Sequence, residues 1–306
     1  MVFHAGAEPV KRENLSVNDT QDTLLDHTHE FVAKNMYGPV AWFDNFFSDE
    51  RTLDEEPVTS SLRWRKELRW EEGGHSSLST FLHANIRLPK ASKKLKLIIT
   101  GDEEEEPEEL LPGNLAEPGF VKSRERERLN MGLRYNLIYT MVSKLHFGSG
   151  IKLKRPLEPY VRARYRHIVP IASAAQVRFT GTALWRNLKG WKETAQLDFE
   201  KLFSESNLIR WSNSVTFEDP AIDYAWGSSL GFQHHLSKKY ALSYDAGMSG
   251  TDTEIMGYRA GIRFRSNFYR EWLFYEIAPE ISWPRDDRGE YNAVPAITFR
   301  IEMQFG

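Results

Sequence analysis

The chain has 306 residues, a formal net charge of -3 and no cysteine. The lack of cysteine excludes disulfide scaffolds, thiol catalysis and cysteine-ligated metals, and the small net charge gives no overall steering toward nucleic acid. The sequence contains no run of about 18 apolar residues, so it predicts no transmembrane helix.

Residues 1–58 differ from the rest and are expected to form an N-terminal segment with short amphipathic helices. Apolar residues recur on one side of residues 20–37, which predicts a helix that ends at Gly38-Pro39. A second amphipathic piece carries four aromatic residues on one face: Trp42, Phe43, Phe46 and Phe47. The first residues lack a basic stretch followed by an apolar one, so we take the chain as a mature form whose export signal has been removed.

Residues 59–306 have a period of two, which is typical of strands with one apolar and one polar face. In the last strand the apolar positions are Pro295, Ile297, Phe299, Ile301, Met303 and Phe305, and the positions between them are Ala296, Thr298, Arg300, Glu302 and Gln304. Fourteen such segments lie near residues 61–70, 78–88, 95–100, 128–139, 144–153, 160–169, 174–186, 191–200, 207–217, 223–233, 239–249, 255–265, 272–283 and 293–305. Most have about ten residues, and a tilted membrane strand needs about 9–11.

The connections after even-numbered strands are short, whereas those after odd-numbered strands are often longer, notably residues 101–127. This rhythm predicts an up-and-down barrel with short turns at one rim and long loops at the other. Several residues break the alternation. Lys66, Glu193 and His167 fall in the apolar register, and Phe81, Trp272 and Phe274 fall in the polar one.

With these residues in view, the chain resembles Gram-negative outer-membrane β-barrels of porin-like size. The resemblance rests on the amphipathic strands, on aromatic residues in the apolar register such as Trp185, Trp211 and Trp283, and on the terminal Phe305. It implies an all-β transmembrane antiparallel barrel in the bacterial outer membrane, in contact with outer-membrane lipid and lipopolysaccharide. It also implies that barrel-assembly machinery reads the C-terminal strand, with Phe305 as the assembly signal.

In such a barrel the polar register faces the lumen. We expect a basic wall from the middle strands, formed by Arg128, Arg134, Lys144, Lys152, Arg162, Arg164, Arg166 and Arg178. We expect an acidic wall mostly from later strands, formed by Asp198, Glu200, Asp245, Glu276, Glu280 and Glu302. Opposed walls of opposite charge would let a pore select polar or anionic solutes without a binding pocket. The alternative is that these charges are ordinary ion pairs that fill the barrel interior.

Three functions follow from this reading. The first is a channel or porin for small polar or anionic solutes, gated by the N-terminal segment, whose acidic residues could dock on the basic wall while its aromatic residues form a plug. The second is a closed barrel that anchors a periplasmic complex, with a protein partner bound through residues 1–58. The third is an outer-membrane hydrolase, for which no serine and histidine in the sequence have suitable spacing. We expect no enzyme activity, cofactor, metal site or nucleic-acid partner.

Overall fold

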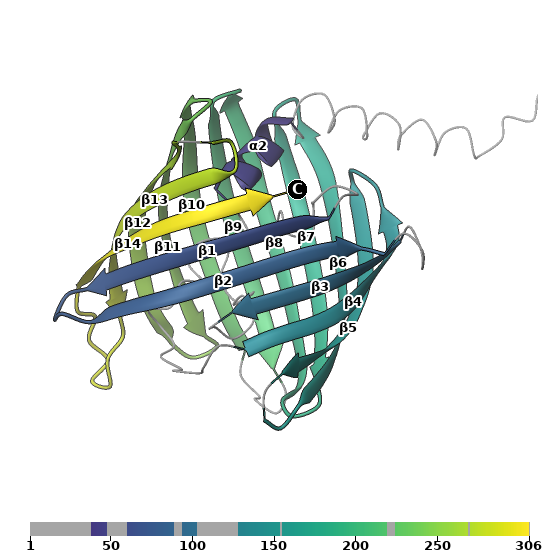
Figure 1. The fold of residues 1–306 in the computed structure, drawn as a ribbon. Helices are drawn as coiled ribbons and strands as arrows, with labels where there is room; N and C mark the ends of the chain where they lie inside the picture. Colours follow the sequence, from purple (N-terminus) through teal and green to yellow (C-terminus); the bar gives the residue numbers. More distant parts are fainter. Residues whose placement is uncertain are drawn as a thin grey trace, which may run out of the picture.

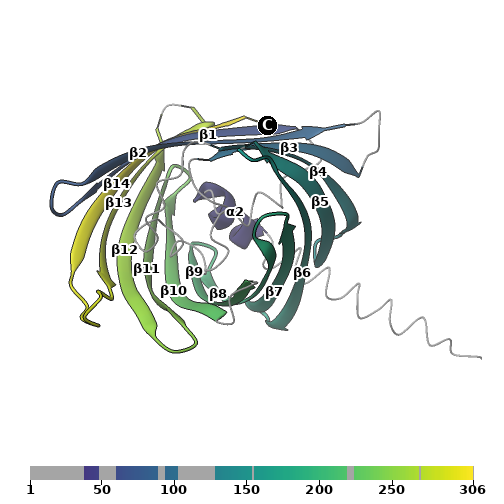
Figure 2. The ribbon, with the colours of Figure 1, turned by 90° about the horizontal axis from the view of Figure 1, so that it is seen from below.

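The computed structural model describes residues 38–47, 60–88, 94–102, 128–153, 155–218, 224–268 and 270–305. In these residues fourteen antiparallel strands form one closed barrel, with the short helix α2 (Gly38–Phe46) inside the ring (Figures 1 and 2). The strands are β1 (Ser61–Glu71), β2 (Ser76–Arg87), β3 (Leu95–Asp102), β4 (Arg128–Tyr139), β5 (Ser143–Leu153), β6 (Glu158–Ala172), β7 (Ala175–Arg186), β8 (Gly190–Ser204), β9 (Asn207–Glu218), β10 (Tyr224–Ser237), β11 (Tyr240–Thr251), β12 (Ile255–Asn267), β13 (Leu273–Pro284) and β14 (Val294–Phe305). The predicted barrel class and strand number are confirmed.

Each strand pairs with its neighbour in sequence, and β1 pairs with β14 to close the ring. Closure therefore leaves no strand edge open, which a sheet in hydrocarbon requires because no water is available to its backbone. Helix α2 begins at Gly38, where Pro39 lies in the first turn and its missing N–H costs no hydrogen bond. The helix predicted over residues 20–37 and the long connection 103–127 lie outside the described residues.

The two faces of the sheet have the polarity expected for a barrel in lipid. On β14 the side chains of Phe299 and Ile301 are 42% and 50% exposed on the outer surface. Between them Arg300, on the inner face, is 5% exposed. A soluble protein would bury the apolar residues and expose the charge, so the apolar face of this strand has hydrocarbon as its solvent. Within the described residues, no helix has the length and apolar character needed to span a membrane.

The short-turn rim follows the predicted rhythm, since three of its six connections have two residues each, 173–174, 205–206 and 238–239. The opposite rim is more varied than expected. Its β1–β2 connection is also tight, with Gly73 at φ 89° and Gly74 at φ 81°, a backbone region that glycine adopts without strain. Both the N-terminal end of β1 and the C-terminal end of β14 lie at the short-turn rim, beside α2 (Figure 1).

The residues that break the alternation have separate explanations. Lys66 is exposed on the outer face of β1, and its Nζ lies 5.8 Å from the ring centroid of Trp64. Glu193 is exposed near the start of β8, close to the long-loop rim where a charge reaches water. Trp272 does not face the lumen as its register predicts, because it stacks on the outward-facing Phe305 with ring centroids 5.3 Å apart.

Candidate functional site

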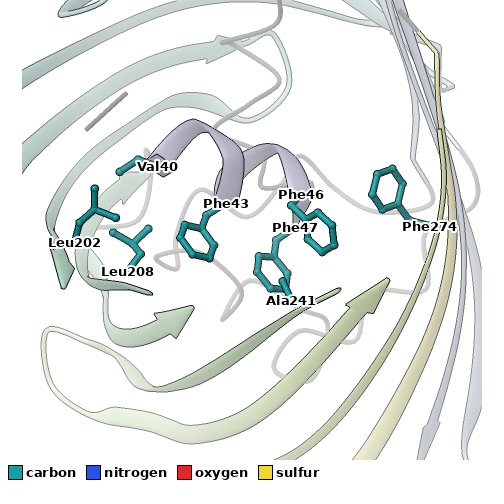
Figure 3. Packing of buried hydrophobic residues seen from close by; sticks show 8 residues of the cluster. All are labelled: Val40, Phe43, Phe46, Phe47, Leu202, Leu208, Ala241 and Phe274. Atoms are coloured by element: carbon teal, nitrogen blue, oxygen red, sulfur yellow. The ribbon is translucent and has the colours of Figure 1, made fainter. Parts of the chain in front are cut away.

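Helix α2 fills the short-turn mouth of the lumen with its apolar face. Val40, Phe43, Phe46 and Phe47 are buried against Leu202, Leu208, Ala241 and Phe274 of the barrel (Figure 3). These four barrel residues lie next to the β8–β9 turn, the β10–β11 turn and the start of β13. Burying one such aromatic or aliphatic side chain contributes about 1.5–3 kcal/mol. The structure thus places the aromatic residues predicted to form a plug at one mouth of the lumen. Phe274 breaks the alternation of β13 because its side chain packs against α2.

Aromatic contacts fix the helix to two sides of the mouth. Trp42 stacks on Phe46 with ring centroids 4.7 Å apart, and its ring centroid lies 3.8 Å from that of His235 on β10. Phe46 meets Phe274 edge-on at 5.7 Å, and the Arg263 guanidinium lies 5.4 Å from the Phe47 ring centroid. Edge-to-face aromatic pairs add about 0.5–1.5 kcal/mol to the burial they bring.

Asp44 joins the polar side of α2 to the barrel wall. Its side chain is fully buried and accepts hydrogen bonds from Arg210 Nη2 at 2.5 Å and from Arg178 Nη2 at 3.3 Å. Glu200 lies on β8, between Arg178 on β7 and Arg210 on β9. Its carboxylate accepts hydrogen bonds from Arg210 Nε at 2.7 Å and from Arg178 Nη2 at 3.3 Å. We call these four residues of α2, β7, β8 and β9 the latch. A buried charge is tolerated only when it is paired, and every charge in the latch is paired.

A second arc of the lumen is a dense set of ion pairs on β1 and β11–β14, which we call the ion-pair wall. Arg300 of β14 contacts Glu67 and Glu276 at 2.5 Å each, and Arg265 contacts Glu302 at 3.0 Å. The remaining pairs include Arg69–Glu280, Arg259–Glu280 at 2.8 Å, Arg63–Glu302 at 3.7 Å and Arg263–Asp245 at 4.0 Å.

The ion-pair wall differs from the acidic wall that the sequence led us to expect. Asp245, Glu276, Glu280 and Glu302 do face the lumen, but arginines lie between them and pair with each of them. The arginines occupy the same inward register as the carboxylates, so the alternation that singled out Glu276 and Glu302 would also have found Arg263, Arg265 and Arg300. Asp198 and Glu200 lie elsewhere, on β8: Glu200 belongs to the latch, and Asp198 accepts from Gln196 Nε2 at 2.9 Å.

A third arc is basic and spans β3–β6. We define the basic wall by its inward-facing Lys96, Arg134, Lys144, Lys152, Arg162, Arg164 and Arg166. Glu158 of β6 is the acidic side chain that the structure describes on the inner face of these strands. The structure therefore brings six of the predicted basic residues together and adds Lys96, while Arg178 belongs to the latch. Arg128 starts β4, opposite Asp102 in the register.

Between the latch and the charged Arg186 and Lys192, the inner face of β7–β9 is lined by short hydroxyl side chains. They are Thr180, Thr182, Thr194, Ser212, Ser214 and Thr216. Thr194 and Thr216 are hydrogen-bonded to each other through their hydroxyl oxygens at 2.9 Å. The inner surface thus has a basic arc, an arc of arginine–carboxylate pairs and a patch of hydroxyl side chains.

The structure also brings together a serine and a histidine that sequence spacing did not connect. Ser143 Oγ lies 2.7 Å from His167 Nδ1, on the outward register of β5 and β6 near the short-turn rim. Serine hydrolysis needs a third group that orients the imidazole. Within the described residues, no carboxylate or amide is hydrogen-bonded to His167, and its ring stacks on Tyr165 instead. Those residues also place no cluster of three or more histidine, aspartate or glutamate side chains that could hold a metal ion.

The closed antiparallel ring, the apolar outer surface and the charged lumen define an outer-membrane β-barrel of porin-like size. No family model matches the chain. No curated protein matches its sequence.

Solved structures of similar architecture include the outer membrane channel DcaP of Acinetobacter baumannii, which is 8% identical with a TM-score of 0.47, over 82% of this chain and 99% of that one. A loop-deletion mutant of OmpT, an outer membrane protein of Vibrio cholerae, is 10% identical with a TM-score of 0.46, over 80% and 98%. The fold class rests on the strand pairing of this chain, and its function is argued below from its own lumen.

Proposed function

We propose that this barrel is an outer-membrane channel for small polar and anionic solutes, and that α2 narrows its short-turn mouth. The observation that carries the proposal is the uneven charge of the lumen. Basic side chains gather on the arc formed by β3–β6, whereas arginines alternate with carboxylates on the ion-pair wall of β1 and β11–β14 (Figure 2). Fixed charge of one sign on a low-dielectric wall attracts counter-ions and repels co-ions.

The docked helix supports the second half of the proposal. Its aromatic face and Asp44 hold it inside the mouth, so a solute that crosses the barrel must pass beside it or displace it. In lipid, the short-turn rim of such barrels faces the periplasm, so α2 would control the periplasmic entrance.

The test is conductance in planar bilayers, with the full-length chain beside a version that lacks residues 1–58. Under a salt gradient we expect the reversal potential to show anion preference, and Arg162→Glu with Arg164→Glu should reverse its sign. The matched control removes the Arg259–Glu280 pair by Arg259→Gln with Glu280→Gln, which leaves the net charge unchanged and should keep the preference. A barrel that insulates both with and without residues 1–58 would rule out the channel.

The occupied mouth also favours the anchor as a second candidate, because a closed barrel could hold residues 1–58 as a docking segment for a periplasmic protein. A channel opens when α2 leaves, whereas an anchor stays closed. An insulating barrel that retains a periplasmic partner only when residues 1–58 are present would support the anchor.

A further inference from the structure

The barrel half of the latch has the form of a carboxylate site. Arg178 of β7 and Arg210 of β9 flank Glu200 of β8, and they donate to different oxygens of Asp44, Arg178 through both Nη atoms and Arg210 through Nη2. Arg178 reaches Oδ2 and Arg210 reaches Oδ1, so the two guanidinium groups hold the carboxylate from two sides. Guanidinium groups bind carboxylates through such charge-assisted, geometrically matched hydrogen bonds.

The barrel itself contributes contacts that orient these arginines. Glu200 accepts from Arg210 Nε at 2.7 Å and from Arg178 Nη2 at 3.3 Å, and Gln176 Nε2 donates to the same carboxylate at 2.5 Å. All of these side chains come from β7, β8 and β9, so these contacts can persist when α2 leaves. With α2 docked, the arginines and Glu200 are almost completely shielded from solvent.

Asp44 supplies part of the negative charge at the site. The two guanidinium groups share the Glu200 carboxylate, and each also contacts Asp44. Asp198, opposite Arg178 in the register, accepts a hydrogen bond from Gln196 and adds a further negative charge beside Arg178. Removing Asp44 therefore takes one carboxylate partner away from each of two desolvated arginines, which is costly for buried charges.

We propose that Arg178 and Arg210 form a binding site for the carboxylate group of a solute, and that Asp44 occupies this site as an internal ligand that the solute displaces. A solute carboxylate at the site accepts the hydrogen bonds that Arg178 and Arg210 otherwise donate to Asp44. Asp44 would then be buried without a counter-charge, so α2 leaves the mouth. The binding step stands on the latch geometry, and its consequence for transport rests on the channel proposed above.

The competition has a defined concentration scale. Asp44 is linked to the barrel through the chain, and such linkage gives a ligand an effective concentration of roughly millimolar. The apolar burial of α2 adds to this advantage, so the free carboxylate is supplied in large excess over that concentration. Acetate is the probe, because it carries the same group as Asp44 and little else. Chloride at equal ionic strength controls for screening.

The readout is the reactivity of a single cysteine on the hidden face of α2. The chain has no cysteine, and Val40 is 2% exposed, so Val40→Cys in the full chain gives one thiol that docking protects. We expect acetate to speed the reaction of this thiol with a membrane-impermeant maleimide several-fold over chloride. Asn45→Cys, on the exposed side of α2, should react at the same rate in both salts.

Adding Asp44→Ala should reverse the sign of the acetate effect. Without Asp44 the thiol should react fast in chloride. Only the apolar face of α2 then holds the helix in place, and docking would bury two arginines that have each lost a carboxylate partner. Acetate should then slow the reaction, because it fills the space of the missing carboxylate and restores the counter-charge. Acetate would then speed the reaction of the thiol when Asp44 is present and slow it when Asp44 is absent. Neither screening of charges by salt nor a general loosening of the barrel can produce these opposite effects.

Two further variants locate the effect. Arg178→Gln with Arg210→Gln should abolish the acetate dependence, whereas Glu280→Gln, which disturbs a buried pair outside the latch, should retain it. The proposal would be overturned if the thiol reacts at equal rates in acetate and chloride, both in Val40→Cys and in Val40→Cys with Asp44→Ala. It would also be overturned if the acetate effect persists when both arginines are replaced. If a latch variant fails to assemble, the two salts compared on Val40→Cys alone still decide the release step. No conductance enters this assay, so its failure is distinct from failure of the channel.

Discussion

Asp44 of α2 and Arg210 of β9 are 166 residues apart in sequence, yet Arg210 Nη2 donates to Asp44 Oδ1 at 2.5 Å inside the barrel. This contact joins the N-terminal segment to the wall at the mouth where the chain enters and leaves the barrel. It makes the position of α2 depend on a charge pair as well as on apolar burial.

The pair should show strong energetic coupling. Asp44→Asn takes one of its partners from buried Arg210, and Arg210→Gln takes one of its partners from buried Asp44, while the double variant removes both charges, so their effects should not add. We expect a coupling free energy of about 0.5–3 kcal/mol for α2 docking. Protection of the thiol in Val40→Cys measures docking in each variant, and strictly additive effects would contradict the contact.

Breaking the ion-pair wall should destabilise the barrel itself. Glu276 contacts Arg300 at 2.5 Å and Arg265 at 3.4 Å, and all three side chains are buried. Glu276→Gln should therefore cost about 3–5 kcal/mol in the free energy of unfolding. The comparison is Glu254→Gln at the rim, where Glu254 and Arg285 are 45% and 31% exposed and their pair is worth about 0–1 kcal/mol. Urea unfolding in lipid vesicles measures both, and equal costs would count against a structural role for the wall.

Lys66 should lower stability because its charge lies on the outer face near the middle of β1. A lysine at the bilayer midplane costs about 2–4 kcal/mol, and less as it approaches the interface. Lys66→Leu should raise the free energy of unfolding, whereas Glu193→Leu near the rim should change it little. A destabilised Lys66→Leu barrel would mean that the lysine has a favourable contact, such as its ring contact with Trp64.

Phe305 should matter for assembly more than its exposed area suggests. We propose that it is read by the assembly machinery, and it also stacks on Trp272 at the end of β14. Phe305→Ala should reduce the folded fraction in cells several-fold, measured by heat-modifiable migration on gels. Phe299→Ala, an outward phenylalanine of similar exposure on the same strand, is the matched control. Equal losses would assign the effect to apolar area alone.

Much of the fold was predictable because alternation is a local property of a strand. The inward register of Arg162, Arg164 and Arg166 can be read from residues on the same strand, and the structure places these three on the inner face. The balance of charge across the lumen was not predictable in this way. Whether Glu302 forms part of an acidic wall depends on Arg265, 37 residues away, which reaches it only once β12, β13 and β14 pair in register.

The sequence by itself determined the period of two, the apolar outer face and the number of strands, because each follows from the order of neighbouring side chains and the solvent they meet. Only the tertiary structure decided which charges are neighbours and where α2 lies. Arg300 and Glu67, 233 residues apart, meet because β1 pairs with β14, and Asp44 finds Arg178 and Arg210 because three strands present them at one mouth. Contacts across a lumen depend on ring closure and register, which no single strand encodes.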